Sequence, residues 1–332
     1  MSVTTNDISS SRTVQVNGTG KRPVAVLIAG PTASGKTALS IQLAKELDAW
    51  VVNADSMQIY KDLHILSARP SPEEESQAPH FLFGHVDSEQ PYSVMTWLED
   101  FGAVLSQAKK DGRPLVVVGG TGLYFQSALE GISLVPEIPE DVRQRWRDAS
   151  QDAPSEELHK ALEARDQVMA QRLRPSDTQR IVRALEVVEG TGLSLSLWQA
   201  ERSTPLIDFD AAMPVVLLPE RKILHERIGR RFDGMVKQGA VEEACSLCAK
   251  GLDPKLQVMK AIGVKLLADA AQGRTSMDWA VEKAKTETRR YAKRQSTFFK
   301  GQLTSWPKLD PLNEQDVELF VASVKDAFSR KA

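Results

Sequence analysis

Residues 30–37, GPTASGKT, have the types and the spacing of a loop that binds phosphate groups. They match the pattern G-x-x-x-x-G-K-[ST] in full, in which glycines let backbone N–H groups converge on an anion and the lysine adds a compact charge. The hydroxyl of Thr37 or Ser34 is a candidate ligand for Mg²⁺ or for a phosphate oxygen. The pattern predicts a phosphorylated ligand without saying which one. The residues expected to contact it are Gly30, Pro31, Thr32, Ala33, Ser34, Gly35, Lys36 and Thr37.

Asp55, in the segment AWVVNADS, is a candidate general base. A P-loop protein that hydrolyses a nucleotide carries an acidic residue after a later apolar strand, where it holds Mg²⁺. The later run here, LVVVGGTG, ends in Gly-Gly-Thr and supplies no carboxylate. Asp55 comes earlier, where kinase-like enzymes place a base that acts on the acceptor, so we expect it to act on an incoming nucleophile. The alternative is an aspartate that only caps a loop.

Three further segments carry groups suited to phosphates. Thr121, in the turn GGTG, could contact a leaving oxygen, and HERIGRRF places Arg227 and Arg231 on one helical face. An arginine beside a diphosphate neutralises charge as it develops. The segments QRIVR and TRRYAKRQSTFFKG combine basic groups with apolar or aromatic ones, as RNA-binding helices do. The alternative for each basic run is a solvated helix face.

The elements that must position these residues read as strands alternating with helices. Apolar runs at residues 23–30, 49–54, 115–118 and 213–218 predict strands, and residues 37–47, 93–110 and 276–300 have helical patterns. This alternation predicts an α/β fold with a parallel sheet, whose ligands bind at the carboxyl ends of the strands. The phosphate loop, Asp55 and Thr121 all fall at that edge.

In the middle of the chain, the alternation of strands and helices gives way to helices alone. Residues 138–203 are charged, helical in pattern and free of strand signals, which predicts a helical insertion between two parts of a core at residues 21–137 and 204–315. The first 20 residues, rich in Ser, Thr, Asn and Gly, predict a disordered tail.

The composition limits which classes of protein the chain can belong to. The 332 residues are 42% hydrophobic with a formal net charge of −2, as in a soluble globular protein, so any nucleic-acid site must be a local basic face. No apolar stretch approaches the roughly 20 residues that span a membrane, and no secretory signal is present, so we expect a cytoplasmic protein. Cys245 and Cys248 are too few for a structural zinc site and predict small buried residues.

Taken in order, these segments resemble the tRNA dimethylallyltransferase family. The resemblance runs from about residue 24 to residue 301 and rests on GPTASGKT, NADSMQIY, APHFLFGHVD, VVGGTGLY, QRIVRALEV, LHERIGRRFDGMV, KAIGVK and TRRYAKRQSTFFK. It implies a P-loop NTPase-like core whose loop binds dimethylallyl diphosphate in place of ATP. It also implies transfer of the dimethylallyl group to N6 of the adenine 3′ to the anticodon, with release of diphosphate.

The resemblance also implies roles for single residues. Lys36 and the loop amides would hold the diphosphate, Mg²⁺ would bridge it with help from Thr37, and Arg231 would add charge. Thr121 would lie near the bridging oxygen, and Asp55 would accept a proton from the adenine amine. The helical insertion would bind the anticodon stem-loop, and we expect the enzyme to act as a monomer. The positions that match tRNA contacts of the family are Asp55, Ser56, Met57, Gln58, Gln179, Arg180, Ile181, Val182 and Arg183.

Three other functions compete with this one. An adenylate isopentenyltransferase would modify free AMP, ADP or ATP, but a free nucleotide does not require the helical insertion with its Gln-Arg-x-x-Arg run. A small-molecule kinase would bind ATP in the same loop and could use residues 138–203 as an arginine-bearing lid. A tRNA-binding protein without activity is disfavoured by the intact set of Lys36, Asp55, Thr121 and Arg231.

Overall fold

The computed structural model describes residues 22–330, so the predicted tail at residues 1–20 lies outside the described part. The chain divides into two compact units, one made of Glu130–Pro205 and the other of the segments before and after it. The segment expected to be a helical insertion, residues 138–203, lies inside the first of these. None of the helices within residues 22–330 is long and apolar enough to cross a membrane.

The larger unit is built on a six-stranded sheet in the order β3-β2-β4-β1-β5-β6, in which every pairing is parallel. This confirms the predicted α/β fold with a parallel sheet. The central strands are continuous apolar runs because helices cover both faces of the sheet. The strands are β1 (Ala25–Ala29), β2 (Trp50–Asn53), β3 (His80–Phe81), β4 (Leu115–Gly119), β5 (Ala212–Leu217) and β6 (Lys308–Leu309).

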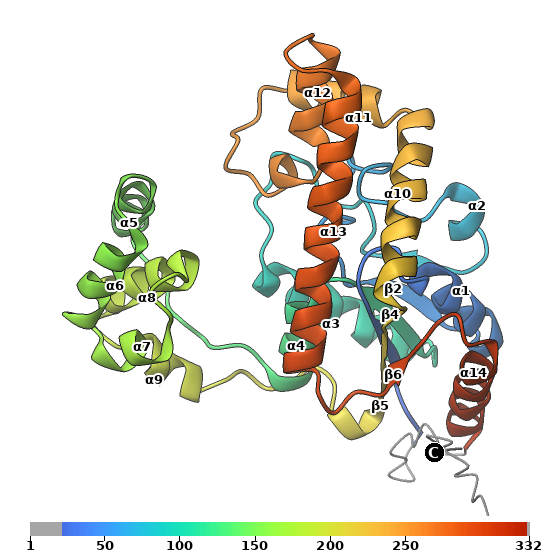
Figure 1. The fold of residues 1–332 in the computed structure, drawn as a ribbon. Coiled ribbons are helices and arrows are strands. Elements are labelled where there is room, and N and C mark those ends of the chain that lie inside the picture. Colours follow the sequence, from blue (N-terminus) through green and yellow to red (C-terminus); the bar gives the residue numbers. More distant parts are fainter. Residues whose placement is uncertain (1–21, 331–332) are drawn as a thin grey trace, which may run out of the picture. The chain divides into compact units, whose positions relative to one another are not determined.

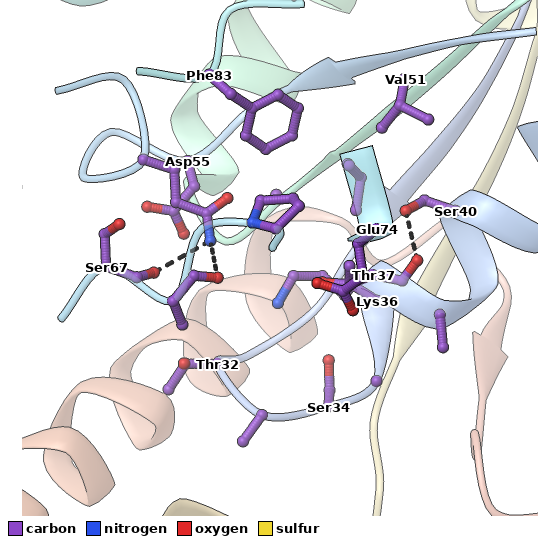
Figure 2. A pocket seen from close by; sticks show the side chains of 18 of the residues that line it. Thr32, Ser34, Lys36, Thr37, Ser40, Val51, Asp55, Ser67, Glu74 and Phe83 are labelled. Carbon is purple, nitrogen blue, oxygen red and sulfur yellow. Dashed lines mark hydrogen bonds between the residues drawn. The ribbon is translucent and has the colours of Figure 1, made fainter. Parts of the chain in front are cut away.

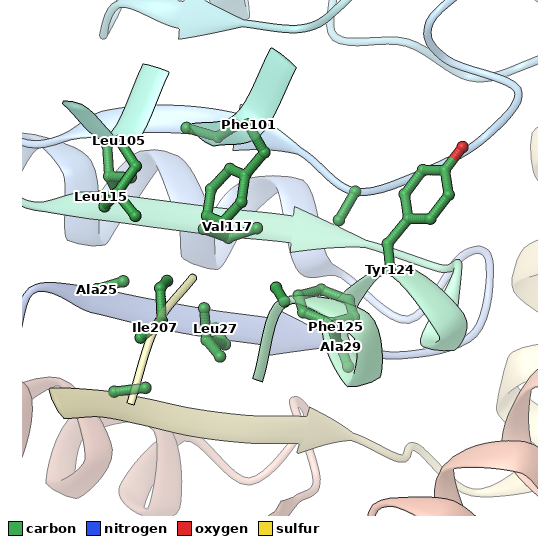
Figure 3. Close-up of a cluster of buried hydrophobic side chains, with 14 of the residues drawn as sticks. Ala25, Leu27, Ala29, Phe101, Leu105, Leu115, Val117, Tyr124, Phe125 and Ile207 are labelled. Atoms are coloured by element: carbon green, nitrogen blue, oxygen red, sulfur yellow. The ribbon is translucent and has the colours of Figure 1, made fainter. Parts of the chain in front are cut away.

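Successive residues of the central strands point to opposite faces and fill two separate cores. On one face, Leu27 and Val117 pack with Phe101 of α3 (Val94–Lys110) and Phe125 of α4 (Gly122–Glu130), as Figure 3 shows. On the other face, Ile28 packs against α1 (Lys36–Leu47) and α14 (Glu314–Ser329). The core therefore continues beyond the expected limit at residue 315, because α14 completes the layer that α1 begins.

Four further helices of this unit, α10 to α13, lie between β5 and β6 in the chain. The long helix α13 packs against α10 and α12, and Figure 1 shows α10 and α13 running side by side. Helix α13 begins where Ser276 accepts a hydrogen bond from the Trp279 N–H. The remaining elements are α2 (Pro72–Glu75), the 3₁₀ turns η1 (Phe209–Ala211) and η2 (Val258–Lys260), α10 (Arg221–Lys237), α11 (Ala240–Ala249), α12 (Val264–Ala271) and α13 (Met277–Gln302).

The smaller unit, Glu130–Pro205, is helical apart from a single bridge between Ser133 and Arg202. Its core forms around α8, whose Ile181 and Leu185 are fully buried among apolar residues of the other helices. Its helices are α5 (Glu140–Asp152), α6 (Ser155–Glu163), α7 (Gln167–Arg172), α8 (Thr178–Thr191) and α9 (Leu195–Ala200).

Candidate active site

The phosphate loop joins β1 to α1 and borders a cavity into which Lys36, Glu74 and Asp55 bring charged groups (Figure 2). Gly35 has φ +93°, in the left-handed region that favours glycine, and directly precedes α1. At Gly30 an added Cβ would lie 2.8 Å from Ser34 Oγ and 2.9 Å from the Leu217 carbonyl oxygen, so no side chain fits. The Ser34 hydroxyl is buried without a hydrogen-bond partner among residues 22–330, as expected of a group kept for a ligand.

Lys36 provides the central cation of this cavity. Its Nζ donates to the Pro31 carbonyl at 2.8 Å, which folds the side chain back over the loop. Desolvation lowers the pKa of Lys36 to about 8, Asp55 acts in the opposite direction, and Arg231 adds to the lowering. The charged ammonium is therefore held in a place that disfavours it until an anion arrives.

Asp55 and Thr121 meet at the carboxyl edge of the sheet, as the sequence predicts, because β2 and β4 are neighbours. Asp55 Oδ1 accepts from the Met57 N–H at 3.0 Å, which leaves Oδ2 without a partner among the described hydrogen bonds. The Thr121 hydroxyl accepts from the Ser56 N–H at 3.0 Å and donates to Ser56 Oγ at 3.3 Å. The base candidate and the hydroxyl are thus tied together through Ser56.

Arg231 reaches the same place from α10. It lines the cavity of the phosphate loop, about 340 Å³ in volume, and its guanidinium donates to the Ala68 carbonyl at 3.2 Å. Desolvation inside the pocket lowers the pKa of Arg231, while Glu74 and Asp55 act in the opposite direction. Arg227, one turn earlier, lines this cavity too, so the expected shared face of the two arginines is turned to the site.

A second cavity of about 240 Å³ adjoins the first. Asp55 and Arg231 line both, so a group in one cavity can meet a group in the other at these two side chains. The wall of the second cavity combines apolar side chains, such as Phe232 and Met235 from α10, with polar and charged ones, and Tyr291 from α13 closes it on another side. Thr32 and Ala33 of the phosphate loop also border both cavities.

The segment from Leu63 to Pro70 closes part of both cavities and is held by side chains from elsewhere. The Gln58 amide donates to the carbonyls of Ser67 and Ala68, at 3.1 and 2.9 Å. The Gln58 amide thus holds this segment beside the site, and the contact with tRNA that the family resemblance implies for Gln58 stays a prediction. Met57, also expected at the tRNA, is half-buried against an apolar cluster.

Glu243 of α11 holds this segment from its other side. Its carboxylate accepts from three consecutive N–H groups, at 2.7 to 2.8 Å, which belong to His64, Ile65 and Leu66. Nothing in the sequence marks Glu243, because one glutamate on an amphipathic helix has the appearance of a solvated residue.

In the smaller unit, α8 presents part of the expected tRNA-binding run on its surface. Gln179, Arg180 and Arg183 are exposed, and the two arginines pair with carboxylates of the same helix region, at 2.9 and 3.3 Å. Ile181 and Val182, which the pattern also places at the tRNA, are 0% and 8% exposed and belong to the core. Side chains that are this deeply buried do not contact RNA directly. They pack in the core of the smaller unit and so fix the helix that carries the two arginines.

The side chains that commonly bind metal ions are not clustered in the described part of the chain. Within residues 22–330 there is no group of three or more His, Cys, Asp or Glu side chains that could hold a metal ion. Cys245 and Cys248 are free thiols on α11, half-buried among apolar residues. A cation at the phosphate loop would therefore depend on hydroxyl, phosphate and water ligands.

Comparison with known proteins relates this geometry to a family. The sequence model described as IPP transferase matches residues 58–302, and that described as isopentenyl transferase matches residues 23–81. The chain is 50% identical over 279 residues to a tRNA dimethylallyltransferase of Chelativorans sp. (strain BNC1), covering 84% of this chain and 96% of the relative. It is 48% identical over 300 residues to the tRNA dimethylallyltransferase of Beijerinckia indica subsp. indica, covering 90% and 98%.

Solved structures agree with these matches. The full-length tRNA isopentenylpyrophosphate transferase from Bacillus halodurans aligns with a TM-score of 0.65 at 30% identity, over 93% of this chain and 98% of that one. A eukaryotic dimethylallyltransferase acting on tRNA aligns with a TM-score of 0.72 at 27% identity, over 88% of this chain and 75% of that one. The matches span both the phosphate loop and the helices around it, and the chain belongs to the tRNA dimethylallyltransferase family.

Proposed function

We propose that this chain transfers the dimethylallyl group of dimethylallyl diphosphate to N6 of the adenine 3′ to the anticodon in tRNA. The observation that carries the proposal is the position of Asp55, which lines both the cavity of the phosphate loop and the second cavity beside it. A donor that is anionic at one end and apolar at the other fits this junction. An acceptor can then approach the base from the second cavity.

In this proposal the diphosphate lies against the phosphate loop. Backbone N–H groups at the start of α1, the ammonium of Lys36 and the guanidinium of Arg231 neutralise its charge. Neutralisation makes diphosphate a better leaving group, because the negative charge that develops on the bridging oxygen is met by groups already in place.

Mg²⁺ fits this site as an ion that arrives with the diphosphate. Thr37 lines the cavity, and its backbone carbonyl, not its hydroxyl, accepts from the Ser40 hydroxyl. Mg²⁺ commonly binds through substrate phosphates and retained waters, so the sparse protein ligands are compatible with it. Thr37 would hold the ion, which would supply further neutralisation of the diphosphate.

The reaction needs one bond to form, one to break and one proton to move. The N6 lone pair of adenine attacks the allylic C1, and the C1–O bond breaks with its electron pair passing to diphosphate. Asp55 Oδ2 accepts the N6 proton, since an aromatic amine is a poor nucleophile and profits from a positioned base. The Thr121 hydroxyl, which now donates to Ser56 Oγ, turns its proton toward the leaving oxygen.

The acceptor must be an adenine that leaves its stack to enter the second cavity, as bases do in enzymes that modify them. Exposed Gln179, Arg180 and Arg183 support binding of the tRNA backbone by the helical unit. A free nucleotide would not use these residues, which favours tRNA over AMP as the acceptor.

The test is transfer of a radiolabelled dimethylallyl group with bulk unmodified tRNA, an anticodon stem-loop and AMP as parallel acceptors. We expect label on tRNA and on the stem-loop, none on AMP, and a loss of about 10²- to 10⁴-fold in rate for Asp55→Asn. Asp278→Asn, an exposed aspartate of α13, is the matched control and should leave the rate unchanged. Label on AMP alone would indicate the adenylate enzyme, and phosphoryl transfer from ATP would indicate a kinase.

A further inference from the structure

Gln295 is one of few buried polar side chains in the described chain, with 6% of its surface exposed. It lies in the second half of α13, the helix that packs against α10 and α12. A polar amide in such a place is costly unless both of its ends are hydrogen-bonded, and both are.

The two ends of this amide bind two different parts of the active site. Gln295 Oε1 accepts from the N–H of Thr32 in the phosphate loop at 2.9 Å. Gln295 Nε2 donates to the carbonyl of Gly120 at 2.9 Å, directly before Thr121. The pairing of β1 with β4 ends at Ala29 and Gly119. The amide thus joins the phosphate loop, which follows β1, to the turn that follows β4.

The space around Gly120 brings the amide next to the base. A Cβ added at Gly120 would lie 2.2 Å from Gln295 Nε2 and 2.9 Å from Asp55 Oδ2. Both groups therefore border the same point, which only glycine leaves open. The neutral amide lies beside the carboxylate without adding charge to it.

We propose that Gln295 is a positioning residue that fixes the phosphate loop relative to the turn carrying Thr121 and to Asp55. The inference rests on the proposed function, because the loop would hold the diphosphate while the turn and Asp55 would act on the bond that breaks and the proton that leaves. Gln295 touches neither substrate. It acts by keeping the two halves of the site at the spacing that in-line displacement needs.

The first test removes both hydrogen bonds while keeping the shape. In Gln295→Met, the Thr32 N–H and the Gly120 carbonyl lose their partner. We expect the single-turnover rate at saturating dimethylallyl diphosphate to fall about tenfold to hundredfold and the KM for dimethylallyl diphosphate to rise. The Kd for tRNA alone should stay within twofold of the wild-type value.

The matched control is Gln302→Met, which makes the same change at an exposed position of the same helix. If the wild type and the control both transfer the dimethylallyl group and Gln295→Met has an unchanged rate, the positioning role is wrong. The proposed function would stand in that case. Absence of transfer in the wild type would instead overturn the proposed function. Circular dichroism and melting temperature establish that each variant is folded.

The second test uses a side chain that can make both hydrogen bonds only when protonated. In Gln295→Glu, the carboxylic acid accepts from Thr32 and donates to Gly120, whereas the carboxylate has lost the donor. The charged and titratable groups that face neighbouring Asp55 are Lys36 of α1, Arg231 of α10, Tyr124 of α4 and Tyr291 of α13. Both proteins share these groups, so the titratable group in which the variant differs from the wild type is the carboxyl group at position 295, beside Asp55 and Tyr291.

We expect the ratio of the Gln295→Glu rate to the wild-type rate to be near one at low pH. It should fall about tenfold as the pH rises and the glutamate ionises. Gln302→Glu should show no such decline. A ratio near one at every pH would mean that the side chain only fills space. A ratio that is low at every pH would mean that the hydrogen bonds do not carry the effect, and either result would refute the inference.

Discussion

Lys36 should make the binding of dimethylallyl diphosphate strongly pH-dependent between pH 7 and pH 9, where a lysine with its ordinary pKa would not. Its pKa is lowered from 10.5 to about 8, chiefly because the ammonium is desolvated in the pocket. Only the protonated side chain offers a charge to the diphosphate. Raising the pH from 7 to 9 should therefore weaken binding.

The expected size follows from the titration of this one group. With a pKa of about 8, roughly nine in ten Lys36 side chains are protonated at pH 7 and roughly one in eleven at pH 9. The Kd should thus rise about tenfold, or about 1.4 kcal/mol in binding free energy. For a lysine with its ordinary pKa, the Kd would change by only a few per cent over the same range.

The assay is calorimetric titration with an unreactive thiolo analogue of dimethylallyl diphosphate at pH 7, 8 and 9, at constant ionic strength. Binding at pH 9 should also take up close to one proton, which shows as a dependence of the heat on the buffer. Lys36→Arg keeps its charge throughout and should remove the pH dependence. Lys45→Arg, on the exposed side of the same helix, should retain it. A wild-type Kd that changes less than twofold would refute the reasoning.

Three further substitutions test other parts of the site. Glu243→Gln should lower the free energy of unfolding by about 2 kcal/mol in denaturant titration, because an amide replaces a carboxylate that accepts from three N–H groups. The same change at the exposed Glu242 should leave the free energy of unfolding unchanged. Gly120→Ala should reduce the single-turnover rate at least tenfold, since its Cβ has no room, whereas Gly301→Ala meets open space and should be neutral. Arg183→Glu should raise the KM for tRNA severalfold, more steeply at low salt, and leave the KM for dimethylallyl diphosphate unchanged.

The parts of the fold that could be predicted from sequence are those with a local signal. The run from β1 through the phosphate loop to α1 is such a part, because apolar strand, glycine turn and helix follow one another directly. The strands β3 and β6 could not be predicted, since two residues carry no periodicity and pair only because a neighbouring strand offers its edge. Apolar runs and the glycine-rich loop thus predict the central strands of the sheet, while its two edge strands depend on tertiary contacts.

The site divides in the same way. Asp55 and Thr121 could be placed together because the carboxyl ends of parallel strands share one edge. Helical spacing places Arg231 on one face with Arg227, and only the resemblance to the family implies that this face is turned to the diphosphate. Gln295 could not be assigned a role, because its partners Thr32 and Gly120 lie 263 and 175 residues away. The resemblance implies a tRNA contact for Gln58, and no local signal in the sequence predicts that its amide also donates to the carbonyls of Ser67 and Ala68.

The electrostatics of the phosphate loop lead to a final prediction about stability. Lys36 and Arg231 each have a lowered pKa, so the folded protein carries two cations in a place that disfavours them. The folded pKa of Lys36 lies below its value in the unfolded chain. The folded state therefore binds fewer protons than the unfolded state between about pH 8 and 10.5, and the penalty from Lys36 is present below pH 8 and relieved as the pH rises.

A diphosphate analogue should therefore stabilise the protein more at pH 7 than at pH 9. At a concentration of 100 times the Kd at pH 7, it should add about 2.7 kcal/mol to the free energy of unfolding. At pH 9 the same concentration is only about ten times the Kd, and the gain should be about 1.4 kcal/mol. Thermal unfolding with and without the analogue measures both values, and Lys36→Arg should show equal gains at the two pH values. Equal gains in the wild type would mean that the cation holding the diphosphate is not Lys36, and that the arginines on α10 carry the charge of the site.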